Sequence, residues 1–224
     1  PILVNINSVR LLYCYPDMID DELIAEIRDN PKIIKYLDIP LQHSESRVLK
    51  LMNRRGTREE YLALIEKLKR EIPDIAIRST FISGFPSETE EEFEGMCEFL
   101  RQAKLVNCGF FAYSREPDTP AYKMAGQVPY AVKKRRVKKL YAVQREISEE
   151  YLSRYVGRTV KVLCDGIDYD RGCFVGRAYF SAPDIDGKVY FNAANAVQGE
   201  YYEVKISSCD SYDMYGETED FDGE

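Results

Sequence analysis

The sequence has no tryptophan, one histidine and no closely spaced pair of cysteines. A structural metal site needs paired cysteine or histidine ligands, so the chain as given is predicted to hold no metal and to keep its thiols reduced. The signatures of a Walker loop, a GxGxxG turn and a Ser-His-Asp triad are also absent. None of the six cysteines lies in a CxxC or CxxxCxxC spacing: Cys14, Cys97, Cys108, Cys164, Cys173 and Cys209.

Long hydrophobic runs and an excess of positive charge are lacking as well. No apolar stretch approaches the ~18 residues of a membrane helix and no signal peptide precedes Val9, so we expect a cytoplasmic protein with no membrane role. Lys and Arg number 31 against 38 Asp and Glu, a net charge of −7. This balance makes a nucleic-acid partner unlikely.

The charge is unevenly distributed along the chain. Residues 156–224 hold 6 basic and 14 acidic residues, whereas residues 1–155 hold 25 and 24. A length of 224 residues suffices for two ordinary domains. We therefore expect a nearly neutral domain at 1–155 and an acidic one at 156–224.

The first 155 residues alternate between strand and helix patterns. Strands are expected to start at Val9, Tyr36, Ala76 and Cys108, at the spacing of βα units, and a long helix should run from Pro129 to about Tyr155. Such units form a parallel sheet covered by helices. A complete eight-unit barrel takes about 250 residues, so the fold class is α/β, an incomplete parallel (β/α) barrel, and strands before Val9 are expected to be missing.

Two helices of this region carry capping-box patterns. Thr57 with Glu60 and Ser87 with Glu90 have the Ser/Thr-x-x-Glu spacing in which the side chain of each residue bonds the backbone of the other. Each pair is therefore expected to start a helix.

Residues 156–224 change to short alternating segments separated by turns. This pattern predicts a small, closed or nearly closed all-β barrel of the five-stranded, oligonucleotide-binding-like class. The last eight residues, ETEDFDGE, form an acidic tail that is expected to fray.

Loops at the carboxyl ends of the strands carry the candidate functional residues, because reactive groups of parallel barrels lie there. Gln42, His43 and Ser44 could hold a ribose or a carboxylate, or Ser44 could merely cap the next helix while its neighbours satisfy loop backbone. Gly84 allows close approach to a flat ligand and Glu88 stands at a helix start, although a plain strand-turn-helix joint has the same spacing.

Arginines offer groups for a carboxylate or a phosphate. Arg54 and Arg55 fit such a role and a solvated surface equally well. Arg78 lies within a strand of a buried sheet, so it should point into the barrel or pair with an acid. The basic run KKRRVKK at 133–139 lies on an amphipathic helix and is interpreted as a solvated face rather than a binding patch.

Four segments in this order resemble the later part of the barrel of the radical S-adenosylmethionine methylthiotransferases. They are RLLYCYPDMIDDELI, YLDIPLQHSESRVLKLMNRRGTREEYL, IRSTFISGFPSETEEEF and FFAYSREPDTPAYKM, and the region after Tyr155 resembles the TRAM barrel of that family. Only the first eight residues, PILVNINS, fit poorly.

The resemblance implies a reaction with S-adenosylmethionine and two 4Fe-4S clusters. Neither cysteine set for these clusters is in this chain, so the chain alone should be inactive. The family also implies an electron donor as partner. By position, eight residues would line the cofactor and substrate pocket: Gln42, His43, Ser44, Arg78, Thr80, Gly84, Glu88 and Tyr113.

Two subfamilies compete for this sequence. One modifies an adenosine of transfer RNA and usually carries a PVQSGS-like loop in place of PLQHSES. The other methylthiolates an aspartate of small-subunit ribosomal protein twelve and resembles this chain in LDIPLQH, MNRRGT, FFAYSRE and GRAYFSAPDIDG. A barrel of net charge −8 fits a basic ribosomal protein better than transfer RNA, so we favour the second. A non-catalytic module that binds a basic partner is the remaining alternative.

Overall fold

A computed structural model describes residues 6–221, which divide into two compact units between Gln144 and Arg145. Residues 1–5 of the poorly fitting PILVNINS stretch lie outside the described part. The uneven charge along the chain predicted a domain boundary after residue 155, and that boundary stays a prediction. Within the described residues, none of the helices combines the length and the apolarity that a bilayer-spanning segment needs.

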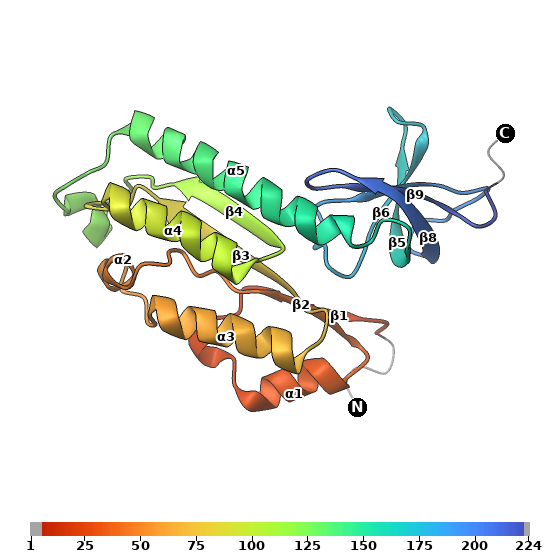
Figure 1. The fold of residues 1–224 in the computed structure, drawn as a ribbon, viewed down its shortest axis with the longest axis horizontal. Helices are drawn as coiled ribbons and strands as arrows, with labels where there is room; N and C mark the ends of the chain where they lie inside the picture. Colours follow the sequence, from red (N-terminus) through yellow and green to blue (C-terminus); the bar gives the residue numbers. More distant parts are fainter. Residues whose placement is uncertain (1–5, 222–224) are drawn as a thin grey trace. The chain divides into compact units, whose positions relative to one another are not determined.

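The first unit is built on a four-stranded parallel sheet in the order β1-β2-β3-β4 (Figure 1). Helices follow the strands along the chain, which confirms the predicted βα units. The strands are β1 (Val9–Leu11), β2 (Ile33–Asp38), β3 (Ala76–Ser83) and β4 (Asn107–Ala112). The helices are α1 (Asp21–Asp29), α2 (Ser46–Leu51), α3 (Arg58–Glu71), α4 (Glu90–Ala103) and α5 (Tyr130–Ser153), with short 3-10 turns η1 (Pro16–Met18) and η2 (Pro120–Lys123).

The two faces of the sheet differ in burial. Along β3, Ile77, Ser79 and Phe81 are buried, whereas Arg78 and Thr80, which alternate with them, are only half-buried. The Phe81 ring packs on Phe99 of α4 at 6.1 Å between centroids. One face of the sheet is therefore the core beneath the helices, and the other presents polar side chains.

Helix caps confirm one sequence prediction and correct another. Thr57 and Glu60 form the expected capping box at α3. At α4 the box consists of Thr89 and Glu92, so the prediction of Ser87 with Glu90 is wrong. Ser87 has a φ of 64°, in the left-handed region, because it lies in the turn before the helix. The helix consequently starts two residues later than the pattern indicated.

Five strands close the barrel of the second unit in the order β5-β6-β7-β9-β8. They are β5 (Thr159–Asp168), β6 (Cys173–Arg177), β7 (Val189–Asn192), β8 (Tyr201–Cys209) and β9 (Met214–Thr218). The closed barrel is as expected. The predicted fraying of the tail is wrong for residues 217 and 218, because they pair with β8 as the end of β9. Residues 222–224 lie outside the described part.

Candidate functional site

Glu88 is the centre of a buried hydrogen-bond network at the carboxyl end of β3. Its Oε1 accepts from Arg136 Nη1 at 2.7 Å and from Ser83 Oγ at 3.2 Å. Its Oε2 accepts from the Gly84 backbone N at 2.7 Å and lies 3.2 Å from His43 Nε2. The side chain is 0% exposed, so these four contacts replace the water that an isolated carboxylate would require.

His43 has its tautomer fixed by this network. The backbone N–H of Glu45 donates to His43 Nδ1 at 3.0 Å, so Nδ1 is the acceptor and carries no proton. The proton of the neutral ring then lies on Nε2 and is donated to Glu88. His43 therefore ties the loop after β2 to the loop after β3.

The basic run of α5 is only partly a solvated face, which corrects the interpretation of residues 133–139. Lys133 and Arg136 are 7% and 4% exposed, whereas Lys134 and Lys138 are exposed. Burial lowers the pKa of Lys133, and the nearby Glu88 carboxylate opposes that shift. Arg136 also donates to Glu90, and this contact lowers the pKa of the Glu90 carboxyl. Two cations of this run thus hold the strand ends.

Gly84 is required by packing against α5. Its φ of 79° is in the left-handed region, and a Cβ placed on it would lie 2.3 Å from Lys133 Cγ. Lys133 Nζ then donates to the Tyr113 carbonyl at 2.9 Å. Helix α5 is thereby held against the ends of both β3 and β4.

Gln42 and Ser44 occupy defined positions in the loop after β2. Gln42 has a φ of 69°, and its backbone N–H donates to Thr80 O while Ile82 N donates to Gln42 O, both at 2.8 Å. Ser44 is buried, and its Oγ donates to Glu45 Oε1 at 3.0 Å. Since Glu45 is the N-cap of α2, Ser44 is not the helix cap.

Arg78 pairs with an acid, one of the two outcomes predicted for it. Arg78 Nη1 donates to Asp38 Oδ1 at 3.2 Å and contacts Thr80 Oγ1 at 3.4 Å. Asp38 and Arg78 are register partners on β2 and β3, so their side chains share one face of the sheet.

Two buried polar atoms at the strand ends have no partner among residues 6–221. They are the hydroxyl of Tyr113, which follows β4, and the Nε of Arg54. Arg54 Nη2 donates to Pro40 O at 2.6 Å, just beyond β2, and its guanidinium stacks over Tyr15 at 5.1 Å. Unpaired buried donors of this kind fit a polar ligand at the strand ends.

The cysteines do not form a cluster. Among the described residues no disulfide occurs, and no group of three or more His, Cys, Asp or Glu side chains is placed to hold a metal ion. Burial, with a smaller contribution from Asp38, raises the pKa of Cys14, and burial raises that of Cys97 to about 11. These thiols are therefore poor thiolate ligands.

Sequence reasoning missed Asp38, Lys133 and Arg136. A signal for the two cations was present in the sequence, because positions 133 and 136 fall on the same helical stripe as the apolar Leu140, which is buried. Asp38 had no comparable signal, since a carboxylate in a strand becomes informative only when its neighbour across the sheet is known.

Comparison with known families assigns both parts of the chain to a class. Residues 3–100 match the Radical SAM superfamily, and residues 156–218 match the TRAM domain. The chain thus carries part of a radical SAM domain followed by a TRAM domain, which confirms the resemblance.

The particular relatives are ribosomal-protein methylthiotransferases. The chain is 47% identical over 217 residues to "Ribosomal protein uS12 methylthiotransferase RimO" of Clostridium botulinum, covering 96% of this chain and 48% of that protein. It is 46% identical over 214 residues to the protein of the same name from Desulfitobacterium hafniense, covering 95% and 48%. The chain therefore spans about half the length of the curated relatives it matches.

A solved structure supports the fold. Coproporphyrinogen III oxidase (HemN) from Escherichia coli, a radical SAM enzyme, aligns with a TM-score of 0.52 and 18% identity over 63% of this chain and 32% of that chain. At this identity the likeness concerns the fold alone.

Proposed function

We propose that this chain is part of an enzyme that adds a methylthio group to an aspartate side chain of ribosomal protein uS12. The observation that carries the proposal is the 47% identity to a uS12 methylthiotransferase across 96% of the chain. The buried network at the strand ends supports it, because radical chemistry needs a rigid pocket that excludes water.

S-adenosylmethionine fits the strand ends. The unpartnered Arg54 Nε is suited to a carboxylate, and the buried Tyr113 hydroxyl is suited to a polar group of the nucleoside. When bound, S-adenosylmethionine supplies the radical source and the methyl group. Gln42, His43, Ser44, Gly84 and Glu88 shape the loops that border this ligand.

These loops act mainly through the backbone. Glu88 is saturated by its four donors, so we assign it to positioning of His43 and the Gly84 turn rather than to direct contact with adenine or ribose. Gln42 can reach the ligand because only its backbone is used in holding β3. Thr80 lies with Arg78 on the polar face of the sheet.

An iron–sulfur cluster does not fit the described residues. They hold no suitable group of cysteines, so both 4Fe-4S clusters would have to be held by sequence outside this chain.

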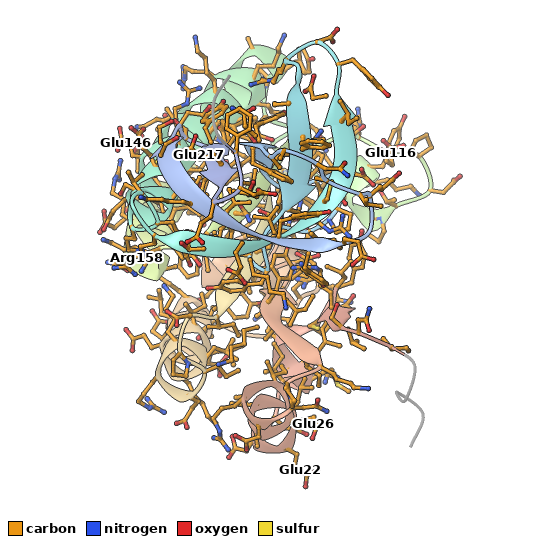
Figure 2. The ribbon with its side chains drawn as sticks, turned by 90° about the vertical axis from the view of Figure 1, so that its right-hand side faces the viewer. Glu22, Glu26, Glu116, Glu146, Arg158 and Glu217 are labelled. Atoms are coloured by element: carbon orange, nitrogen blue, oxygen red, sulfur yellow. The ribbon has the colours of Figure 1, made fainter. Side chains whose placement is uncertain are left out.

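The acidic barrel is the proposed dock for the basic ribosomal protein. Glu203 on β8 and Glu217 on β9 are exposed, and Figure 2 shows Glu217 among the side chains that surround the barrel. The tip of the β5–β6 hairpin adds Tyr169, which is 86% exposed and lies between Asp168 and Asp170. Carboxylates around an exposed aromatic ring suit a Lys- and Arg-rich protein surface.

The full-length protein with reconstituted clusters provides the test. Incubation with uS12, S-adenosylmethionine, a reductant and a sulfide source should increase the mass of one uS12 aspartate by one methylthio group in place of hydrogen. Tandem mass spectrometry locates that residue. Methylthiolation of adenosine in transfer RNA under the same conditions, with uS12 unchanged, would contradict the proposal.

A further inference from the structure

The outward face of helix α5 carries cations that no acid of the described residues neutralises. Residues 130–144 hold six basic and no acidic side chains, in a chain of net charge −7. Four of the six donate to acceptors at the strand ends or on α4: Lys133, Arg135, Arg136 and Lys139. The other two, Lys134 and Lys138, are exposed and have no ion-pair partner among residues 6–221.

Two exposed tyrosines share this face of α5. An α-helix turns by about 100° per residue, so positions 130, 134, 138 and 141 lie within about 80° of one another around the helix axis. Tyr130 is 69% exposed and Tyr141 is 37% exposed. Lys134 Nζ lies 5.5 Å from the centroid of the Tyr130 ring. An aromatic ring thus lies at each end of the lysine pair, and we call these four residues the α5 stripe.

The combination of rings and cations favours RNA over an acidic protein surface. Lys134 and Lys138 are about one helical turn apart, about 6 Å along the axis, so each can contact a different phosphate of one strand. Bases stack on aromatic rings, whereas carboxylates do not. Tyr130 and Tyr141 therefore add a stacking platform to the charged track, the two parts of a site for single-stranded nucleic acid.

The α5 stripe lies on a helix that borders the candidate site. Lys133 donates to the Tyr113 carbonyl and Arg136 donates to Glu88, so the first turns of α5 contact the loops after β3 and β4. The curated relatives are named for action on a ribosomal protein. Such a protein is surrounded by RNA in a ribosome, and RNA strands beside it would come close to these loops.

We propose that the α5 stripe binds single-stranded RNA, with Lys134 and Lys138 on phosphates and Tyr130 and Tyr141 against bases. This inference goes beyond the proposed function and rests on it only for the source of the RNA, the ribosome. It replaces the interpretation of the exposed lysines as a merely solvated face. The negative net charge does not prevent the contact, because acids more than about 8 Å away are largely screened at physiological salt.

The first test measures the salt dependence of RNA binding by the full-length, cluster-loaded protein. Fluorescence anisotropy with a labelled single-stranded RNA gives the slope of log affinity against log salt concentration, to which each phosphate contact contributes about 0.7. K134Q/K138Q should make this slope shallower by about 1.4 and weaken binding at low salt. K134R/K138R keeps both charges and should retain the wild-type slope. K161Q/K205Q removes two exposed cations of the barrel and should also retain it.

A second test separates RNA from other anions. Y130A should weaken RNA binding about fivefold or more through lost stacking, with an unchanged salt slope, whereas Y130F should bind as wild type does. Polyglutamate should compete poorly at equal charge, because it offers no base to stack on the rings. Full displacement of the RNA by polyglutamate, or wild-type affinity in Y130A, would show that the surface takes any polyanion and would overturn the proposal.

The outcomes separate this inference from the proposed function. If wild type modifies uS12 but binds no RNA, or if K134Q/K138Q keeps the wild-type slope, the α5 stripe is not an RNA site and the enzymatic function stands. An equal change of slope in K161Q/K205Q would also overturn the inference. If wild type leaves uS12 unmodified while K134Q/K138Q shows the shallower slope, the proposed function fails and the RNA site stands.

Discussion

The two compact units differ in whether they bury ionisable side chains. Among residues 6–221, every buried ionisable side chain outside the cysteines and tyrosines belongs to the sheet unit: Asp38, His43, Glu88, Lys133 and Arg136. In the barrel unit the buried polar residues are the hydroxyl-bearing Ser148, Ser181 and Thr218. Burying charge costs free energy unless it is paired, so a fold retains it where a fixed arrangement is useful.

The difference agrees with the separate tasks proposed above for the two units. In the sheet unit the buried charges fix the loops at the strand ends, and residues 1–144 are nearly neutral, with 23 basic and 21 acidic residues. The barrel keeps an apolar interior, including Val162, Val204 and Met214, and carries its acids outside. This is the pattern expected of a rigid site in one unit and a charged binding surface in the other.

Removal of Glu88 should have the largest effect on stability. Glu88→Leu leaves Arg136 and His43 without their buried acceptor, so we expect a loss of about 3–5 kcal/mol in the free energy of unfolding. Glu94→Leu is the matched control, because Glu94 pairs with Lys139 at an exposed position and should cost less than about 1 kcal/mol. Urea denaturation followed by circular dichroism measures both, and equal losses would show that the network is not stabilising.

Alanine substitutions at two glycines separate the free-energy cost of a left-handed backbone from the cost of a steric clash. Gly84 and Gly157 have nearly the same φ, 79° and 81°, but a Cβ on Gly84 meets Lys133 whereas one on Gly157 meets nothing within 4 Å. Gly157→Ala should therefore cost about 1 kcal/mol from the left-handed conformation alone, and Gly84→Ala about 1–3 kcal/mol more. If urea denaturation shows similar losses in the free energy of unfolding for both variants, the Lys133 side chain moves aside without cost in free energy.

The secondary-structure elements were predicted well from the sequence, whereas the contact partners of buried side chains were predicted poorly. The four βα units, the Thr57 cap and the closed barrel follow from periodicity and turn residues, which are local properties. The end of β9 was predicted to fray because residues 217 and 218 begin the acidic stretch ETEDFDGE, whereas pairing with β7 and β8 decides its conformation.

The site shows the same division between local and long-range information. Gln42, His43 and Glu88 were predicted as site residues because they follow strands, where sites of parallel sheets are expected. Their actual contacts were not predictable, since His43 and Glu88 are 45 residues apart and meet only when β2 and β3 pair. Arg136 comes from a helix 48 residues after Glu88, so its burial depends on the packing of α5.

Reversal of charge on the barrel should weaken docking of the basic protein by several-fold. Glu203→Lys with Glu217→Lys removes two exposed carboxylates and adds two cations, so affinity for uS12 should fall at low salt and the difference should shrink as salt rises. The control makes the same change at Glu22 and Glu26, one turn apart on α1 (Figure 2), and should leave affinity unchanged. Equal losses of affinity in the two double variants would show that uS12 responds to the net charge of the protein and not to the surface of the barrel.

The smallest predicted effect concerns Lys133 and pH. Because its pKa is lowered in the folded state, the unfolded state binds more protons between that lowered value and about 10.4, and stability contributed at this site rises with pH in that window. The wild-type protein should therefore gain free energy of unfolding relative to Lys133→Met as pH is raised from neutral toward 10.

The difference in free energy of unfolding between the two proteins is the quantity to measure, because the contributions of the tyrosines and other lysines that titrate in both proteins cancel. A constant difference between wild type and Lys133→Met would mean that the ammonium is as well accommodated by Tyr113 O and the Tyr113 ring as it is by water.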